Sequence, residues 1–91
     1  MPARKPTTTT TRRQSPVSEL GAMFAQRLKD ERVAKDWSQT ELAEASGVNV
    51  TFISELERGR KEASLATIER LAAALDVTPA AMLTPPTKSK K

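Results

Sequence analysis

Residues 38–60 read SQTELAEASGVNVTFISELERGR and describe two short helices joined by a tight turn. The stretch opens with Ser-Gln-Thr-Glu, a capping-box pattern that satisfies the free N–H groups at a helix start. Gly47 predicts that this helix ends in the left-handed conformation, and Asn49 is a favoured N-cap for the next helix. Gly59 then predicts where the second helix ends. A turn this tight sets the two helices at a steep angle, so the stretch predicts a helix-turn-helix.

Helical spacing is also present upstream of this stretch. Leu20, Phe24 and Leu28 recur every four residues and predict a helix over about 18–35 with these side chains along one side.

Two more helices are predicted downstream. Ser64 is a candidate N-cap for a helix with a single apolar stripe. The stripe consists of Leu65, Ile68, Leu71, Ala72 and Leu75. Thr78 and Pro79 open a last short helix, because proline is favoured at the first helical position. No segment alternates with a period of two, so the sequence predicts an all-α fold of five helices.

The positive charge of the chain lies at its two ends. The chain has 91 residues and a formal net charge of +4. Residues 1–16 and 84–91 carry seven Lys or Arg and no acidic residue, whereas residues 17–83 carry eight basic and eleven acidic residues. We therefore expect one domain over 17–83, between a disordered basic arm (1–16) and a disordered basic tail (84–91). Such segments either attract a polyanion or only aid solubility, and the arm is either an unstructured leader or a segment that wraps DNA.

The composition excludes several classes of function. The chain contains neither Cys nor His, so it lacks the commonest metal ligands and the commonest general base. It also lacks a glycine-rich phosphate loop and clustered carboxylates. We therefore expect no enzymatic activity, no metal, no cofactor and no small-molecule ligand. No apolar run approaches the ~20 residues of a membrane span, and no secretory signal is visible, so we expect a cytoplasmic protein with no membrane partner.

The second helix of the 38–60 stretch has two unlike faces. At about 100° per residue, Phe52, Ile53 and Leu56 share the face that packs inward. The opposite face carries Val50, Thr51, Ser54, Glu55 and Arg58. Small outward residues let a helix backbone approach base edges in the DNA major groove, which is about 12 Å wide. We interpret this face as a DNA-reading surface, although single apolar residues are also common on ordinary protein surfaces.

These features together resemble the helix-turn-helix of the phage repressor and Cro family, also called the xenobiotic response element-type regulators. The residues that carry the resemblance are Gln39, Ala43, Gly47, Ile53, Leu56 and the run Glu57-Arg58-Gly59. The resemblance extends over about residues 27–83. It implies a compact, lambda-repressor-like bundle of five helices that binds operator DNA, usually as a symmetric dimer. We therefore expect a sequence-specific transcriptional regulator, and specifically a repressor.

The resemblance also implies roles for single residues. The base-reading positions are Val50, Thr51, Ser54 and Glu55. The phosphate-contact positions are Gln39, Arg58, Arg60 and Lys61. Arg32 and Glu57 match an ion pair of the family that fixes the angle of the reading helix.

The chain departs from the best-known members of the family at the first two base-reading positions. Those members often carry glutamines there, whereas this chain has Val50 and Thr51. Both side chains can contact a thymine methyl group, and the Thr51 hydroxyl can also donate or accept. Glu55 can accept from a cytosine amine, pair with Arg58 within the helix, or reject wrong sequences. The operator therefore differs from theirs, and part of the specificity is expected to come from DNA shape.

The last helix predicts a dimer surface. Val77, Met82 and Leu83 form an apolar edge that is either plain core or, in a domain this small, an exposed contact with a second copy. Two-fold symmetry would place two reading helices about 34–36 Å apart on a palindromic operator.

Several biological roles fit this description. The size suits a controller protein of a restriction–modification system, and a phage repressor fragment, a plasmid regulator or a toxin–antitoxin repressor also fits. The rival from another class is a protein-interaction module of the same fold. An acidic or occluded outer face on the second helix of the 38–60 stretch would favour that rival.

Overall fold

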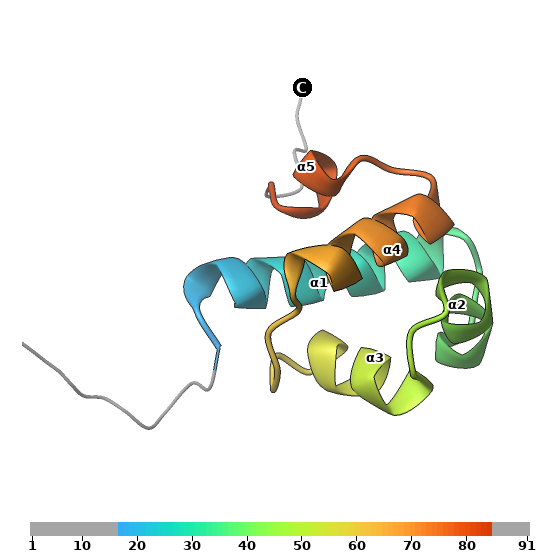
Figure 1. The fold of residues 1–91 in the computed structure, drawn as a ribbon, viewed down its shortest axis with the longest axis horizontal. Helices are drawn as coiled ribbons and strands as arrows, with labels where there is room; N and C mark the ends of the chain where they lie inside the picture. The colour runs from blue at the N-terminus through green and yellow to red at the C-terminus, as the bar shows by residue number, and fades with distance from the viewer. Residues whose placement is uncertain (1–16, 85–91) are drawn as a thin grey trace, which may run out of the picture.

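The computed structural model describes residues 17–84, which form five α-helices and no strand (Figure 1). In chain order the helices are α1 (Glu19–Ala34), α2 (Gln39–Ser46), α3 (Val50–Glu57), α4 (Leu65–Leu75) and α5 (Pro79–Met82). The prediction of an all-α fold with five helices is confirmed. The arm predicted over 1–16 and all but the first residue of the tail predicted over 84–91 lie outside the described residues.

Every helix begins after a side chain that caps it. The N-caps are Ser18, Ser38, Asn49, Ser64 and Thr78, and each accepts from a backbone N–H one turn ahead. At α2 both halves of the capping box are present, because Ser38 and Glu41 each accept from the other's backbone N–H. The caps satisfy donors that a helix start leaves free, which explains why such short helices begin at defined residues.

Left-handed residues follow four of the helices, α1 to α4, and turn the chain. Gly47, with φ of 75°, ends α2, and Gly59, with φ of 73°, follows the C-cap of α3. Asp36 after α1 and Asp76 after α4 both have φ of 62°, which the sequence did not predict. Aspartate is one of the few residues other than glycine that tolerates this conformation.

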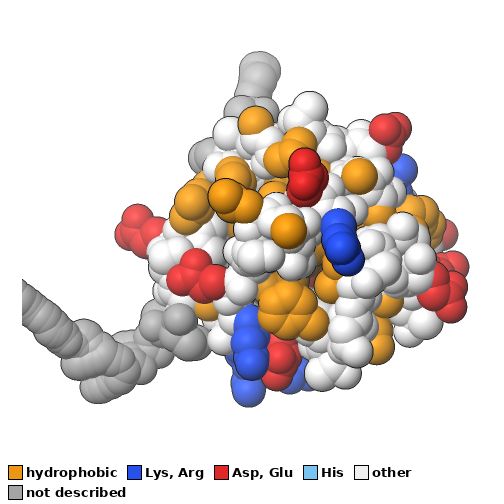
Figure 2. Space-filling view, in the orientation of Figure 1, with side chains coloured by type: hydrophobic (Ala, Val, Ile, Leu, Met, Phe, Trp, Pro, Cys, Tyr) orange, Lys and Arg blue, Asp and Glu red, His pale blue; other side chains and the backbone are white. Residues whose placement is uncertain are grey.

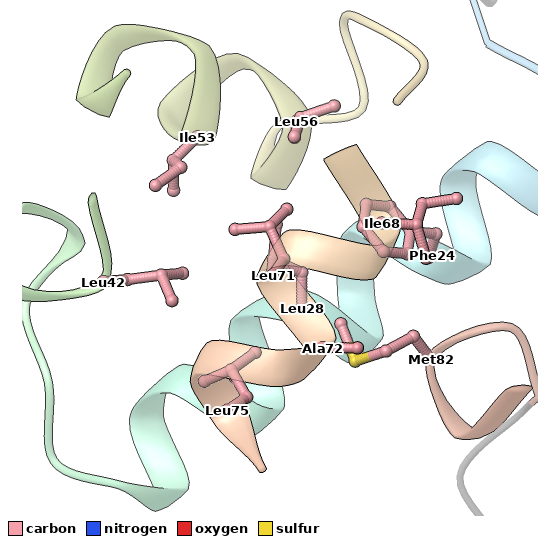
Figure 3. Close-up of a cluster of buried hydrophobic side chains, with 10 residues drawn as sticks. All are labelled: Phe24, Leu28, Leu42, Ile53, Leu56, Ile68, Leu71, Ala72, Leu75 and Met82. Carbon is pink, nitrogen blue, oxygen red and sulfur yellow. The ribbon is translucent and has the colours of Figure 1, made fainter. Parts of the chain in front are cut away.

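All five helices contribute to one core (Figure 3). Its fully packed members are Phe24, Leu28, Leu42, Ile53, Leu56, Ile68, Leu71, Ala72, Leu75 and Met82. Helix α4 lies along α1, α2 packs at one end of this pair, and α3 and α5 lie on opposite sides of it (Figure 1). The arrangement leaves one long face of α3 without a covering helix.

Two apolar residues lie where the sequence did not predict them. Leu20 was predicted to share one side of the helix with Phe24 and Leu28, but it is 51% exposed whereas they are buried, because the first turn of α1 extends beyond the cover of its neighbours (Figure 1). Met82 was expected on an exposed dimer edge, and this was wrong because its side chain is fully buried. Helix α5 folds back against α1 and α4, so Met82 points inward next to Ala72 (Figure 3).

Candidate nucleic-acid interface

The four base-reading candidates share the outward face of α3. Val50 and Thr51 are exposed and Ser54 and Glu55 are half-buried, whereas Ile53 and Leu56 are buried. Within residues 17–84 the side chains of Thr51 and Ser54 form no hydrogen bond or ion pair. These polar groups are therefore available to an external partner.

The turn between α2 and α3 fixes where this face begins. The Gly47 N–H donates to the Ala43 carbonyl at 2.9 Å, and Asn49 Oδ1 accepts from the backbone N–H of Thr51 at 2.8 Å. Ala43 is half-buried against the core at the crossing of the two helices. A larger side chain there would push α2 and α3 apart, so the small residue keeps the turn tight.

A bidentate ion pair joins the end of α3 to α1. The Arg32 Nε and Nη2 atoms donate to the two carboxylate oxygens of Glu57 at 2.7 and 3.0 Å. The side chains are only 13% and 4% exposed, so the pair lies largely out of water. The hydrogen bond to Glu57 raises the pKa of Arg32 above its ordinary value, although partial burial opposes the shift. Such a pair fixes the direction of α3 relative to α1.

Gln39 belongs to the same network. Its Nε2 atom donates to Glu57 Oε1 at 3.0 Å, and this contact was not predicted from the sequence. A third donor of Arg32, Nη1, bonds the Trp37 carbonyl just before α2 at 2.7 Å. The network therefore holds the start of α2 and the end of α3 together. A phosphate contact by Gln39 stays a prediction.

The three predicted cations after α3 lie together on an exposed loop. Arg58, Arg60 and Lys61, with Gly59 and Glu55, line a shallow open hollow. Gly59 turns the chain back, so that the Arg60 N–H donates to the Glu55 carbonyl at 2.9 Å. This return places Lys61 Nζ 3.8 Å from Glu55 Oε1. Glu55 therefore pairs with Lys61, and the intrahelical pair with Arg58 expected as one option does not form within the described residues.

One polar contact near this loop could not be predicted from the sequence. Glu62 accepts from both the backbone N–H and the Oγ of Ser18, at 2.9 and 3.1 Å. The two residues are 44 positions apart. Local pattern cannot reveal a pairing over such a distance, because it depends on how the loop after α3 returns to α1.

The described residues offer neither a metal site nor a membrane span. Over residues 17–84, no group of three or more acidic, His or Cys side chains is placed to hold a metal ion. No helix in this range has the length and apolarity needed to cross a membrane.

Comparison with known proteins decides the family. A family model described as helix-turn-helix matches residues 28–82. The chain belongs to this helix-turn-helix family. The family consists of DNA-binding transcription regulators rather than enzymes, and the predicted membership of the phage repressor and Cro group is confirmed. The lambda-repressor-like fold is confirmed by the solved structures it matches.

Individual relatives cover most of the chain. It is 41% identical over 73 residues to a hypothetical transcription factor of Neisseria meningitidis. The aligned region covers 80% of this chain and 69% of the relative. The restriction-modification controller protein C.AhdI from Aeromonas hydrophila matches with 40% identity and a TM-score of 0.66, over 68% of this chain and 94% of that one. The biofilm regulator SinR, solved in complex with DNA, matches with 35% identity and a TM-score of 0.65, over 67% and 98%. The chain spans 39% of the Escherichia coli regulator SutR and 56% of the ImmF control region 10 kDa protein of Bacillus phage phi105. It spans 51% of the SinR sequence of Bacillus subtilis.

Proposed function

We propose that the protein is a sequence-specific transcriptional repressor that binds a palindromic operator as a homodimer. The observation that carries this proposal is the uncovered face of α3, on which Thr51 and Ser54 have no partner within residues 17–84. The face is bordered by the exposed cations of the α3–α4 loop, and a duplex needs this combination of base-reading and phosphate-binding groups. The match to SinR, which was solved with DNA, supports the same reading.

In this proposal α3 enters the major groove. Val50, Thr51, Ser54 and Glu55 face base edges, while Arg58, Arg60 and Lys61 bind phosphates. The ion pair between Glu55 and Lys61 is long, at 3.8 Å, so a phosphate readily replaces the carboxylate as the partner of Lys61. Glu55 is then free to accept from a cytosine amine.

The dimer is proposed to form through apolar residues around Leu83, which we call the Leu83 surface. Its members are Leu20, Leu65, Ala66, Pro79 and Leu83. Leu65 is 80% exposed, and hydrophobic side chains gather in the region of α4 and α5 on this face (Figure 2). Val77, half-buried at the end of the α4–α5 loop, completes the edge predicted from the sequence, whereas Met82 lies in the core.

The biological system proposed first is control of a restriction–modification operon. The support is the coverage of C.AhdI, 94% of which this chain matches. The decisive observation is the identity of the neighbouring genes, because a methyltransferase and an endonuclease would support this role. A toxin gene or phage genes next to it would instead favour the antitoxin or phage-repressor role.

The central test is selection of bound sequences from a pool of random duplexes. We expect one palindromic sequence to be enriched and to bind at least about 10³-fold more tightly than unrelated DNA at physiological salt. Binding that never exceeds the non-specific level would overturn the proposal. Recovery of one stoichiometric protein partner in place of DNA would favour the protein-interaction module.

Single substitutions then test the roles of the residues. Replacing Thr51 with Ala or Glu55 with Gln should change which sequence is preferred. Arg58→Gln or Lys61→Gln should weaken all sequences alike and reduce the salt slope by about one unit each. Arg70→Gln, which removes an exposed cation from α4, is the matched control and should change neither.

A further inference from the structure

The loop between α3 and α4 is fastened to the start of α1. Glu62 directly follows Lys61, and its two carboxylate oxygens accept from the N–H and the hydroxyl of Ser18 at 2.9 and 3.1 Å. Ser18 is itself held in place, because its Oγ accepts from the Gly21 N–H at 3.0 Å within the first turn of α1. A loop residue is therefore bound to the capped end of a helix.

The Ser18–Glu62 contact is closely packed around Gly21. A Cβ at this position would lie 3.3 Å from both Glu62 Oε1 and Ser18 Oγ. These distances are shorter than ordinary van der Waals contact, so a side chain here would press on both partners of the hydrogen bond. Glycine weakens a helix relative to alanine, and at this position it leaves room for the carboxylate of Glu62.

Lys61 lies between two points at which the loop is held. On one side, the Arg60 N–H donates to the Glu55 carbonyl of α3 at 2.9 Å. On the other side, Glu62 is bound to Ser18. Among the described residues, the Lys61 side chain is 55% exposed and has one ion pair, at 3.8 Å from Glu55. Its position therefore depends on the backbone on both sides more than on its own contacts.

Arg58 is held in a different way. It is the C-cap of α3, and its N–H donates to the Ser54 carbonyl at 3.1 Å. The left-handed Gly59 lies between Arg58 and the rest of the loop. Loss of the Ser18–Glu62 contact should therefore displace Lys61 and leave Arg58 in place.

We propose that Glu62 is a positioning residue for DNA binding, which holds Lys61 within reach of a phosphate by binding Ser18. This inference rests on the proposed function and deepens it, because it gives an acidic residue a favourable role in binding a polyanion. Charge alone predicts the opposite effect, since a carboxylate near a duplex repels its phosphates.

Two substitutions of Glu62 separate its hydrogen bonds from its charge. Glu62→Gln and Glu62→Ala both remove the charge, but only glutamine keeps an oxygen that can accept from the Ser18 N–H. In the full chain, Glu62→Ala should bind the selected operator about fivefold more weakly than Glu62→Gln at about 0.15 M salt, and its slope of log K against log salt should be smaller by about 0.9, because one phosphate contact is lost. Equal affinities and slopes for the two variants would overturn the proposal.

A double-mutant cycle tests whether Glu62 acts through Lys61. In the Lys61→Gln background, Glu62→Ala and Glu62→Gln should bind equally well, because the contact that Glu62 positions is already lost. The matched control is the Arg58→Gln background, in which the fivefold difference should remain. A difference of the same size in both backgrounds would show that Glu62 does not act through Lys61, and the proposal would be wrong.

The folding of each variant is checked by circular dichroism and thermal unfolding. The Ser18–Glu62 contact is exposed to solvent, so its loss should change the unfolding temperature little. Partial unfolding would weaken binding equally in the two backgrounds, so the cycle also separates positioning from a general loss of stability.

The outcomes distinguish this inference from the function on which it rests. If the wild-type chain shows no sequence-specific binding, the proposed function fails. If the wild type binds its operator specifically but Glu62→Ala and Glu62→Gln bind alike, only the positioning role of Glu62 is overturned.

Discussion

At the scale of single residues, Glu57 joins the end of α3 to α1 and α2. Its carboxylate accepts from Arg32 and Gln39, and its side chain is only 4% exposed. Because the pKa of Arg32 is raised, its contribution to stability is fully present below the ordinary pKa of arginine. It is lost only as the pH rises through the still higher value in the folded protein. The guanidinium thus stays charged at any pH at which DNA binding is measured.

Removing one member of this pair should leave the other largely buried and unpaired. We expect Glu57→Ala to lower the free energy of unfolding by about 3 kcal/mol, as measured by urea denaturation. The control is Glu31→Ala, which breaks a less buried i,i+4 pair with Arg27, whose side chains are 19% and 24% exposed, and should cost no more than about 0.5 kcal/mol. Equal losses for the two variants would mean that the Arg32–Glu57 pair has no special structural role.

At the scale of the elements, the starts of the helices were predictable from the sequence, whereas two of the left-handed residues that follow helices were not. The N-caps and the Gly47 turn depend on local sequence, so Ser38, Asn49 and Ser64 could be identified before the fold was known. The left-handed Asp36 and Asp76 could not, because aspartate is equally common in other turns.

The turn before α3 provides a test at this scale. Gly47 has φ of 75°, and nothing lies within 4 Å of an added Cβ. We therefore expect Gly47→Ala to lower the free energy of unfolding by about 1 kcal/mol through backbone strain alone. Gly47→Asn should cost less, because asparagine tolerates the left-handed region. Thermal unfolding measures both, and an alanine variant as stable as the wild type would contradict the assignment of strain.

Helix α5 has only four residues and depends on one buried side chain. Met82 is fully buried among residues of α1 and α4. Met82→Ala should therefore lower the free energy of unfolding by about 2–5 kcal/mol. The test is denaturant unfolding, with Ala80→Gly as a control on the exposed side of the same helix. A loss of under 1 kcal/mol for Met82→Ala would show that α5 contributes little to the core.

At the scale of the whole molecule, the outward face of α3 and the Leu83 surface are built from different helices of the bundle. The outward face of α3 was predictable, because helical periodicity alone separates Thr51 from Ile53. The contacts of Gln39 with Glu57 and of Glu62 with Ser18 were not predictable, because they join segments that only the tertiary fold brings together. The exposure of Leu20 and the burial of Met82 were missed for the same reason.

The Leu83 surface gives a prediction about assembly. Leu65→Glu should raise the dissociation constant of the proposed dimer at least tenfold while leaving the unfolding of the monomer nearly unchanged, because Leu65 is 80% exposed. Analytical ultracentrifugation over a concentration series measures this. Val33→Glu changes an apolar residue that is 56% exposed near the other end of α1, and it should have no effect on assembly. An equal effect of both substitutions would place the interface elsewhere.

The separation of the α3 side chains into a buried set and a free set has an evolutionary consequence. Ile53 and Leu56 are buried, so their replacement costs stability, whereas Val50 and Thr51 can change without disturbing the interior. Under the proposed function, a few point mutations on this face would change the target sequence and keep the same scaffold. Transplanting the outward residues of α3 from a paralogue should accordingly redirect the protein to the donor's promoter.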